Sequence, residues 1–323
     1  MRIAVTGANG FVGSNLANYF HTLGNDVLAI VRPHSDTSLL DPAIPVFRTD
    51  YGSEDELAEA LAETEILIHN AGSLRTRTFE QMVAANVVTT RTVLRAFNRS
   101  PKGRRLVFIS SQAASRPSRG SEQVTEEDPS APVDWYGRSK LLAERLIRAE
   151  CVKEWVILRP VPVYGPGERD FFKIFKAVKA GVTFRIGRKE QYLNLIHTDE
   201  LCVLMGYCCE LEQAAGQVFF AADGEVYTHS RFMASVAEIL GVKPRDIVIP
   251  VPLAVIAFHT GELFERITGR STLVNKQKMK ELVNVNWVCS IDKARKILGW
   301  HPQPDLEGNL RKTFDWYRRK GWL

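Results

Sequence analysis

Tyr136 and Lys140 are the two residues of this 323-residue chain whose types and spacing best suit acid–base chemistry. They stand four apart at the start of a predicted helix over 136–150, so their side chains share one face of it. A phenol with an ordinary pKa near about 10 transfers protons poorly at pH 7, and a neighbouring ammonium lowers that pKa by stabilising the phenolate. Ser111 ends a predicted strand over 106–111 that faces this helix, where its hydroxyl could hydrogen-bond a substrate oxygen. The alternative is a packed tyrosine beside a solvated lysine, because Tyr-x-x-x-Lys is common by chance.

A glycine-rich turn near the N-terminus indicates what such a pair would work with. The apolar run 2–6 predicts a strand, Gly7-Ala8-Asn9-Gly10-Phe11-Val12-Gly13 follows at once, and a helical pattern comes next. Gly7 permits the tight turn, Gly10 lets a pyrophosphate approach the main chain, and Gly13 lets the helix lie close to the strand. A plain strand–turn–helix connection is the alternative. Because the turn directly follows an N-terminal apolar strand, we expect a dinucleotide at Gly7, Asn9, Gly10, Phe11 and Val12.

The end of the second predicted strand, 26–31, bears on which dinucleotide binds. Many NAD-binding folds place a carboxylate there for the ribose 2′-hydroxyl, whereas an arginine suits a 2′-phosphate. Here Val31 is followed by Arg32, and no carboxylate comes before Asp36. We therefore expect Arg32 to hold the extra phosphate of NADP, with Ser35 adding a hydrogen bond and NAD remaining possible. A solvated loop cation is the alternative for Arg32.

Further cofactor candidates follow other predicted strands. Asp50 and Tyr51 end the predicted strand 45–50, where an adenine could lie, and the small-residue turn Asn70-Ala71-Gly72 follows the strand 66–69. Asn86 lies inside a predicted long helix over 81–99, where a structural and a cofactor role are equally plausible. Tyr136 and Lys140 would also contact the cofactor, because the ammonium can hold the nicotinamide ribose hydroxyls.

Strands and helices alternate through the first half of the chain, which is typical of βαβ units and a parallel sheet. We expect a Rossmann-type doubly wound domain over 1–165, with part of 190–220 returning to it, and a smaller, mainly helical substrate region over 166–323. A polar, proline-containing loop over 116–135 is predicted to be a lid or disordered. Additional helices are predicted over 54–62, 171–180, 200–210, 229–240, 253–268, 275–282, 292–298 and 306–319, and strands over 155–159 and 217–221.

Composition excludes several classes of protein. Charged residues are 24% and the hydrophobic set is 45%, ordinary values for a globular protein, and a net charge of +5 without a basic tract argues against nucleic acid. Five cysteines without CxxC spacing argue against a disulfide framework or zinc site and for a reducing cytosol. We see no signal peptide, and the longest apolar stretch, 247–258, is too short to span a bilayer. We expect a cytoplasmic protein without a bound metal.

The order of these motifs along the whole chain resembles the extended short-chain dehydrogenase/reductase superfamily, the group also called NAD-dependent epimerase/dehydratases. The matching segments are 6–13, His69-Asn70-Ala71-Gly72, Asn86, Ser110-Ser111, Tyr136-Gly137-Arg138-Ser139-Lys140, Leu158-Arg159-Pro160, 163–167, 197–201 and 294–300. The resemblance implies that Ser111, Tyr136 and Lys140 are the catalytic set. It also implies that Asn86 and the turn from Pro160 to Val163 line the nicotinamide half of the cofactor site, and that helices 81–99 and 137–150 form a homodimer interface.

The branch of the family is less clear from the residues. Sugar-nucleotide epimerases usually carry an asparagine after Tyr-Gly-Pro, whereas this chain has Gly167-Glu168-Arg169-Asp170. That segment and Arg-Pro-x-Ser-Asp after the second strand look more like the dihydroflavonol-reductase and 3β-hydroxysteroid-dehydrogenase-like branch and the hopanoid-associated group. We therefore expect NAD(P)-dependent reduction of a carbonyl, or oxidation of a secondary alcohol, on a small substrate chosen by residues in 113–135 and 171–188.

Two alternatives stay open. One is a nucleoside-diphosphate-sugar epimerase or dehydratase that acts through a transient keto-sugar on bound NAD. Its anionic, nucleotide-linked substrate could be held by four cations that are otherwise solvated: Arg169, Arg185, Arg188 and Lys189. The other is a cofactor-sensing scaffold without catalysis, which the presence of Ser111, Tyr136 and Lys140 argues against.

Overall fold

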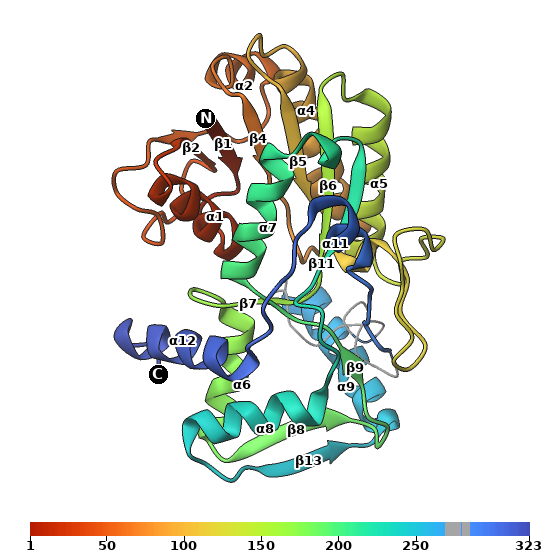
Figure 1. Ribbon diagram of the computed structural model, residues 1–323. Helices are drawn as coiled ribbons and strands as arrows, with labels where there is room; N and C mark the ends of the chain where they lie inside the picture. The colour runs from red at the N-terminus through yellow and green to blue at the C-terminus, as the bar shows by residue number, and fades with distance from the viewer. Residues whose placement is uncertain (269–278, 280–284) are drawn as a thin grey trace.

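A seven-stranded parallel sheet forms the centre of the computed structural model, which describes residues 1–268, 279 and 285–323 (Figure 1). The spatial order is β3-β2-β1-β4-β5-β6-β11, and every neighbouring pair is parallel. The strands are β1 (Arg2–Thr6), β2 (Asp26–Val31), β3 (Val46–Arg48), β4 (Ile66–His69), β5 (Arg105–Ile109), β6 (Glu154–Pro160) and β11 (Gln217–Ala221). The order reverses between β1 and β4, so the predicted Rossmann-type doubly wound sheet is confirmed.

Helices cover both faces of this sheet because alternate strand residues point to opposite sides. Ile3 and Val5 pack in one apolar core with Leu16, whereas Ala4 packs with Phe97 in a second core on the other side. The first core lies under α1 (Phe11–Thr22), α7 (Thr198–Glu210) and α11 (Asp292–Leu298), and the second under α2 (Glu54–Ala60), α4 (Thr89–Asn98) and α5 (Trp135–Glu150). Both faces of the central strands are therefore buried, which explains their continuous apolar runs.

The predicted helix over 81–99 is interrupted by a wider turn. It consists of α3 (Phe79–Val83), a π-helical turn η1 (Ala84–Val88) and α4. The Thr90 hydroxyl donates to the Asn86 carbonyl oxygen at 2.6 Å, directly at this turn. π-helical turns inside α-helices are frequent at functional sites.

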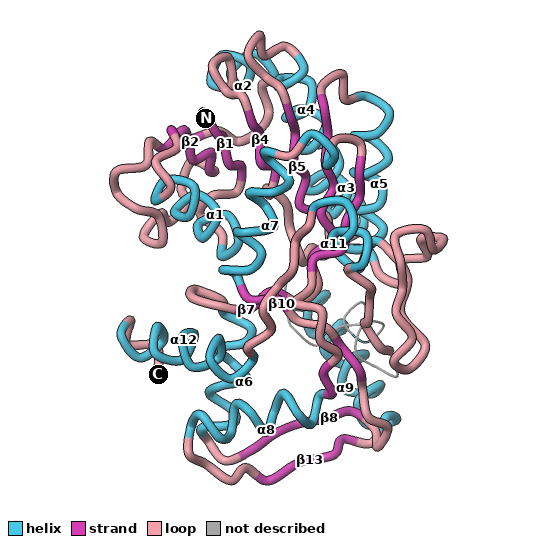
Figure 2. The backbone as a smooth tube through the Cα atoms, in the orientation of Figure 1, coloured by secondary structure: helices cyan, strands magenta, loops and turns pink. Residues whose placement is uncertain are grey.

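The C-terminal region is mainly helical, as predicted, and also contains a small sheet that the sequence did not reveal (Figure 2). Its helices are α6 (Arg169–Lys179), α8 (His229–Leu240), α9 (Val251–Thr268) and α12 (Leu306–Arg319). The parallel pair β8 (Val182–Ile186) and β13 (Arg245–Ile249) was missed because β13 runs almost directly into the apolar start of α9. The predicted helix over 275–282 lies, apart from residue 279, outside the described residues. The remaining short elements are β7 (Val163–Tyr164), β9 (Tyr192–Leu193), β10 (Ile196–His197), β12 (Tyr227–Thr228) and the 3-10 turns η2 (Gln112–Ala114) and η3 (Glu212–Ala214).

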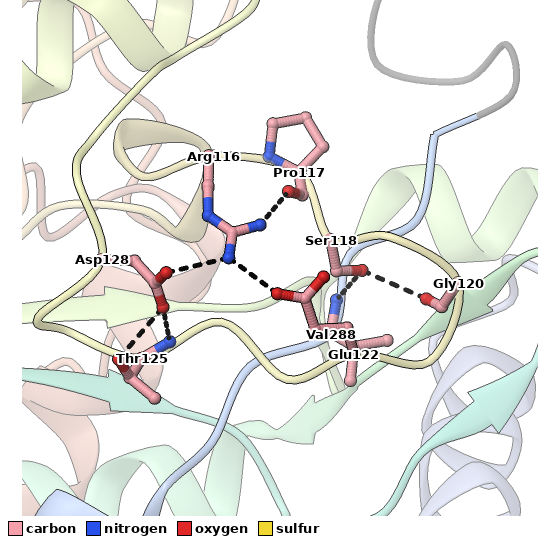
Figure 3. Close-up of polar contacts among 8 residues, drawn as sticks. All are labelled: Arg116, Pro117, Ser118, Gly120, Glu122, Thr125, Asp128 and Val288. Atoms are coloured by element: carbon pink, nitrogen blue, oxygen red, sulfur yellow. Dashed lines mark hydrogen bonds and ion pairs between the residues drawn. The ribbon is translucent and has the colours of Figure 1, made fainter.

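The polar loop before α5 is folded by its own ion pairs (Figure 3). The Arg116 guanidinium donates to Glu122 at 2.9 Å and to Asp128 at 2.8 Å. Hydrogen bonds from Thr125 and the pairing with Arg116 lower the pKa of Asp128 to about 2. The loop is joined to the chain beyond residue 285, since the Val124 and Ser118 amides donate to the carbonyls of residues 288 and 286. It therefore forms one packed wall with that segment.

Among the residues that the structure describes, no helix combines the length and apolar character of a membrane span.

Candidate active site

A cavity of about 830 Å³ opens at the carboxyl ends of β1 and β4, where the strand order reverses. Open α/β sheets bind their ligands at this position. Its lining includes Gly7, Asn9, Gly10, Phe11, Val12, Arg32, Ser35, Tyr51, Asn70, Ala71, Gly72, Ser111, Tyr136, Lys140, Pro160 and Val163. The structure thus brings most of the predicted site residues around one space.

Two glycines let β1, α1 and β4 meet closely at the base of this cavity. Gly7 has φ +65°, and a Cβ built on it would lie 2.9 Å from the Ala71 Cα. A Cβ on Gly13 would lie 2.3 Å from the Gly7 carbonyl oxygen. At Gly10 the nearest atom would be 3.4 Å away, an ordinary contact, so protein packing alone does not require that glycine. Space at Gly10 is left for something other than protein.

The start of α1 fits an anionic group. α1, all of whose residues are described, begins at Phe11 without a side-chain cap and without an acidic residue in its first turn. α5 and α8, by contrast, begin with caps from Asp134 and Thr228. The first N–H groups of a helix have no partner within it and lie at the positive end of its dipole. A cofactor pyrophosphate would supply the missing acceptors.

Tyr51 supports the glycine turn from behind. Its hydroxyl accepts a hydrogen bond from the Gly7 amide at 3.2 Å and donates to the Ile30 carbonyl at 3.1 Å. Burial raises the pKa of Tyr51 to about 12, so the phenol stays neutral and keeps its proton for Ile30. Tyr51 therefore both lines the cavity and fixes the backbone of β1.

A buried chain of hydroxyls and one imidazole, which the sequence did not point out, joins β1 and β4 to the π-helical turn. The Thr6 hydroxyl accepts from the Asn70 and Ala71 amides, each at 3.1 Å, and contacts His69 Nδ1 at 2.7 Å. Because Thr6 already accepts two N–H groups, its own proton points to Nδ1, and His69 Nε2–H then donates to Thr90 at 2.9 Å. Burial, with a smaller effect of Lys140, lowers the pKa of His69 to about 3, so the ring is neutral as this chain requires.

The three predicted catalytic residues come from adjacent elements, and all line the cavity. Ser111 follows β5, and its hydroxyl accepts from the Ala113 amide at 3.1 Å. Tyr136 and Lys140 lie on the first turns of α5, whose start is capped by Asp134. A Cβ on Gly137 would lie 2.0 Å from the Ala113 carbonyl oxygen, so this glycine lets α5 approach the Ser111 turn.

Lys140 is held in an apolar setting. Only 5% of the residue is exposed, its Nζ donates to the Ile109 carbonyl at 2.8 Å, and it lies 4.8 Å from the centre of the Phe108 ring. Burial lowers the pKa of the Lys140 ammonium to about 8, and the Glu144 carboxylate opposes part of that change. The charge of this lysine therefore depends in part on Glu144, one helical turn further along α5.

Glu144 belongs to a buried ion pair that ties together three elements of the site. Its carboxylate accepts from Arg159 Nη2 at 2.7 Å and Nε at 2.9 Å, and the Ser110 hydroxyl donates to it at 2.5 Å. Glu144 and Arg159 side chains are 1% and 3% exposed. Ser110 precedes Ser111, and Arg159 precedes Pro160. The pair thus fixes the ends of β5 and β6 against α5.

Two predicted cofactor residues do not line the cavity in the described part of the chain. The Asn86 amide bridges the Ser73 backbone, accepting at 2.6 Å and donating at 2.9 Å, and donates to the Ser139 hydroxyl at 2.8 Å. The Asp50 carboxylate accepts from the Gly52 amide at 2.7 Å. Asn86 therefore positions the turn after β4 against α5, and Asp50 closes a local turn.

The loop after β2 carries Arg32 and Ser35 into the cavity wall, and a further arginine supports it. Arg48, on β3, donates to the carbonyl oxygens of Pro33 at 2.9 Å and Ser35 at 3.2 Å. The first carboxylate of this loop, Asp36, accepts from the Ser38 amide and hydroxyl. Asp36 is thereby engaged within its own loop.

The substrate half of the cavity is formed largely by residues that sequence reasoning missed. From the two ranges expected to choose the substrate, 113–135 and 171–188, only Ala113, Asp134, Trp135 and Phe171 line the cavity. Much of the remaining wall is formed by residues outside these ranges: Leu74, Arg75, Met82, Gln191, Tyr192, Leu193, His229, Val285 and Trp287. Arg75 pairs with Asp170 at 2.6 Å across the mouth. The segments contributing these side chains are far apart in the chain, so no local pattern could have identified them.

None of the four cations considered for a diphosphate is among the residues that line this cavity. Arg169 packs over the Trp322 ring, with 5.6 Å to its centre, and Arg185 pairs with Asp246 at 2.9 Å. Arg188 and Lys189 are exposed and do not line the cavity. Within the described residues, no three His, Cys, Asp or Glu side chains gather as a metal site would require.

Comparison with known proteins gives a consistent set of relatives. The model of the NAD dependent epimerase/dehydratase family matches residues 3–219. A ceramide reductase of Caulobacter vibrioides is 25% identical over 329 residues, covering 99% of this chain and 96% of that protein. A UDP-glucose 4-epimerase of Vibrio cholerae is 28% identical over 326 residues, covering 96% of this chain and 94% of that protein.

A solved structure shares the fold. MoeE5 in complex with UDP-glucuronic acid and NAD superposes with a TM-score of 0.78 at 22% identity, covering 99% of this chain and 100% of that one.

Proposed function

The chain belongs to the NAD-dependent epimerase/dehydratase family, an enzyme of the oxidoreductase or epimerase type, and from that premise we propose that it reduces a carbonyl on a small, largely apolar substrate with NADPH. The observation that carries this proposal is the wall of the substrate half. It presents Trp135, Phe171, Tyr192 and Trp287, while its cation, Arg75, is already paired with Asp170. A sugar diphosphate would need cations that this wall does not offer among the described residues.

Each member of the catalytic set has one task in this proposal. The dinucleotide, when bound, supplies the hydride that reaches the carbonyl carbon. Ser111 hydrogen-bonds the carbonyl oxygen, and Tyr136 gives that oxygen its phenolic proton, so that ketone, hydride and proton together yield a secondary alcohol. The Lys140 ammonium, one helical turn along α5, would stabilise the phenolate that remains on Tyr136 after this transfer. One of its three N–H donors is bound to Ile109, which leaves two for the ribose hydroxyls.

NADP rather than NAD is the cofactor we propose, because β2 ends in a cation instead of a carboxylate. Arg32 and Ser35 would hold the 2′-phosphate, and Arg48 would keep the loop in place. Asp36 is turned to Ser38 and so does not replace the missing carboxylate. NADPH should therefore bind more tightly than NADH.

We also propose that the enzyme is a cytoplasmic homodimer. Val88 and Leu142, on the neighbouring helical segments η1 and α5, are 49% and 37% exposed, which is consistent with a shared interface of these helices. Light scattering of the purified chain tests this assembly.

The second candidate is a sugar-nucleotide epimerase, which the relationship to the Vibrio cholerae enzyme supports. The two are separated by assaying purified protein with NADPH against apolar ketones of increasing length, and with UDP-glucose. A reductase consumes one NADPH per alcohol formed. Epimerisation of UDP-glucose without net NADPH use, by protein that retains NAD through purification, would overturn the proposal.

Tyr136→Phe tests the acid role directly. Turnover should be lost while NADPH affinity changes little, because the ring is kept. Tyr207→Phe is the matched control, since Tyr207 lies on α7 outside the cavity lining. Retained turnover in Tyr136→Phe would exclude the phenol as proton donor.

A further inference from the structure

The two-stranded sheet β8–β13 has one apolar face that the protein leaves partly uncovered. Phe184 and Ile247 are direct partners in its register and are 46% and 37% exposed. Partnered residues of a parallel pair point to the same side. Thr183, which points to the other side, is buried, and α6 packs against β8. The exposed apolar side chains therefore lie on the outer face of this sheet.

The helix that follows this sheet, α9, also exposes apolar side chains. Residues 251–258 contain no charged side chain. Ala254 and Phe258, one turn apart, are 4% and 6% exposed, whereas Leu253 and Ile256 are 58% and 59% exposed. A helical segment that is apolar on its buried and on its exposed face is atypical of a surface in contact with water alone.

Exposed cations lie close in the chain to these apolar side chains. Arg188, Lys189, Lys243 and Arg245 are all exposed. Arg245 shares the outer sheet face with Ile247, two residues on. The turn carrying Arg188 lies against the start of α9, since a Cβ on Gly187 would be 3.2 Å from Val251. Asp246, the exposed carboxylate next to Ile247, is paired with Arg185 at 2.9 Å.

We propose that Phe184, Ile247, Leu253 and Ile256, here called the docking surface, bind the surface of a lipid bilayer that carries anionic headgroups. Exposed apolar side chains with lysine and arginine nearby in the chain match an interface with acyl chains beneath a negative surface layer. A second copy is a poorer match, because a two-fold interface through the same surface would bring its cations against their own copies. Lipid phosphates neutralise those cations instead.

The docking surface is connected to the wall of the cavity. Ile186 ends β8, and the chain passes through Arg188 and Lys189 to Gln191 and Tyr192, which line the substrate half. A bilayer bound at this surface would lie beside the part of the enzyme that receives the substrate. Such binding does not depend on the direction or the cofactor of the reaction.

Flotation of the full chain with vesicles tests the proposal. We expect binding to vesicles of phosphatidylcholine with phosphatidylglycerol, weaker binding to phosphatidylcholine alone, and loss of binding at high salt. Leu253→Glu/Ile256→Glu should lower partitioning at least about tenfold. Arg188→Glu/Lys189→Glu should lower it about fivefold or more for each cation removed.

A matched control distinguishes binding through this surface from non-specific binding to vesicles. Leu23→Glu/Val152→Glu introduces the same charges at residues that are 60% and 74% exposed elsewhere, and it should bind vesicles like the unmodified protein. Thermal unfolding checks that each variant is folded, and the exposed Arg188/Lys189 turn provides a second test if the α9 variant is not.

Three outcomes would overturn the proposal. The first is no binding to anionic vesicles, and the second is equal, salt-independent binding to both vesicle types. The third is a dimer that Leu253→Glu/Ile256→Glu dissociates while vesicle binding is absent.

Discussion

Glu144 and Arg159 allow a quantitative test of how the site is held together. Replacing Glu144 with Leu leaves the Arg159 guanidinium buried, with Ser130 at 3.2 Å as a remaining side-chain acceptor. Removing one partner of a buried ion pair costs about 3–5 kcal/mol. Arg159→Met should cost less, because the remaining carboxylate accepts from Ser110 and can take up a proton, whereas a guanidinium cannot lose one.

Urea unfolding at pH 7 measures these differences in the free energy of unfolding, with an unchanged m-value as the check on the two-state analysis. The double variant Glu144→Leu/Arg159→Met should lose less stability than the sum of the single variants, because neither partner of the pair is left buried without the other. Glu150→Leu is the matched control on the same helix. Its carboxylate is 37% exposed and pairs with Arg91 and Arg95 at 3.8 and 3.6 Å, so its loss should cost about 1 kcal/mol or less.

The Glu144→Leu variant can also be tested by its effect on activity. Because Glu144 opposes the effect of burial on Lys140, Glu144→Leu should lower the pKa of that ammonium below about 8. Activity that needs a charged Lys140 is lost as pH rises through its pKa, so the alkaline limb of kcat/KM should move to lower pH. If the single variants destabilise equally, if their costs add, or if the limb does not move, the role given to this pair is wrong.

Three further predictions concern other parts of the site. Arg48→Met removes hydrogen-bond donors to the loop after β2 and should raise the KM for NADPH about tenfold in steady-state assays. The kcat and the KM for NADH should stay unchanged, and an equal increase of KM for both cofactors would contradict this role of Arg48. His69 has a pKa near 3 when folded and about 6.5 when unfolded, so the free energy of unfolding should fall as the pH drops from about 6.5 toward 3. Urea midpoints measured across this pH range should fall less in His69→Gln. If the midpoints of both proteins fall in parallel, His69 is not the cause. Gly137→Ala would place its Cβ 2.0 Å from the Ala113 carbonyl oxygen and should cost about 1–3 kcal/mol, seen as a lower Tm; an unchanged Tm would show that α5 can move away freely.

The parts of the fold that could be predicted are those with local causes. The glycine turn after β1 has a residue-by-residue requirement, and at Gly7 and Gly13 the structure shows the close approaches that the sequence implied. Buried parallel strands carry continuous apolar runs, so the central sheet was recognisable. Tyr136 and Lys140 could be placed together because four residues along a helix make one turn.

The parts that could not be predicted depend on contacts between distant segments. The β8 and β13 partners Phe184 and Ile247 are brought together across an intervening stretch that includes several other elements. Thr6, His69 and Thr90 form one hydrogen-bonded chain, yet each alone is an ordinary polar residue at a strand end or in a helix. Asn86 was predicted only in part. The sequence singled it out as a candidate for the cofactor site, whereas its side chain contacts the protein backbone at Ser73.

The hydrogen bonds between the loop before α5 and the chain beyond residue 285 affect how this enzyme can be recombined with its relatives. Val124 and Ser118 bind the backbone at 288 and 286, next to the cavity residues Val285 and Trp287. Residues 285–288 therefore help to form the wall of the cavity, and a truncation before them would remove part of that wall. A chimaera that exchanges either segment with a relative should exchange both together. Otherwise the hydrogen bonds between the two segments would have to form between parts of different proteins.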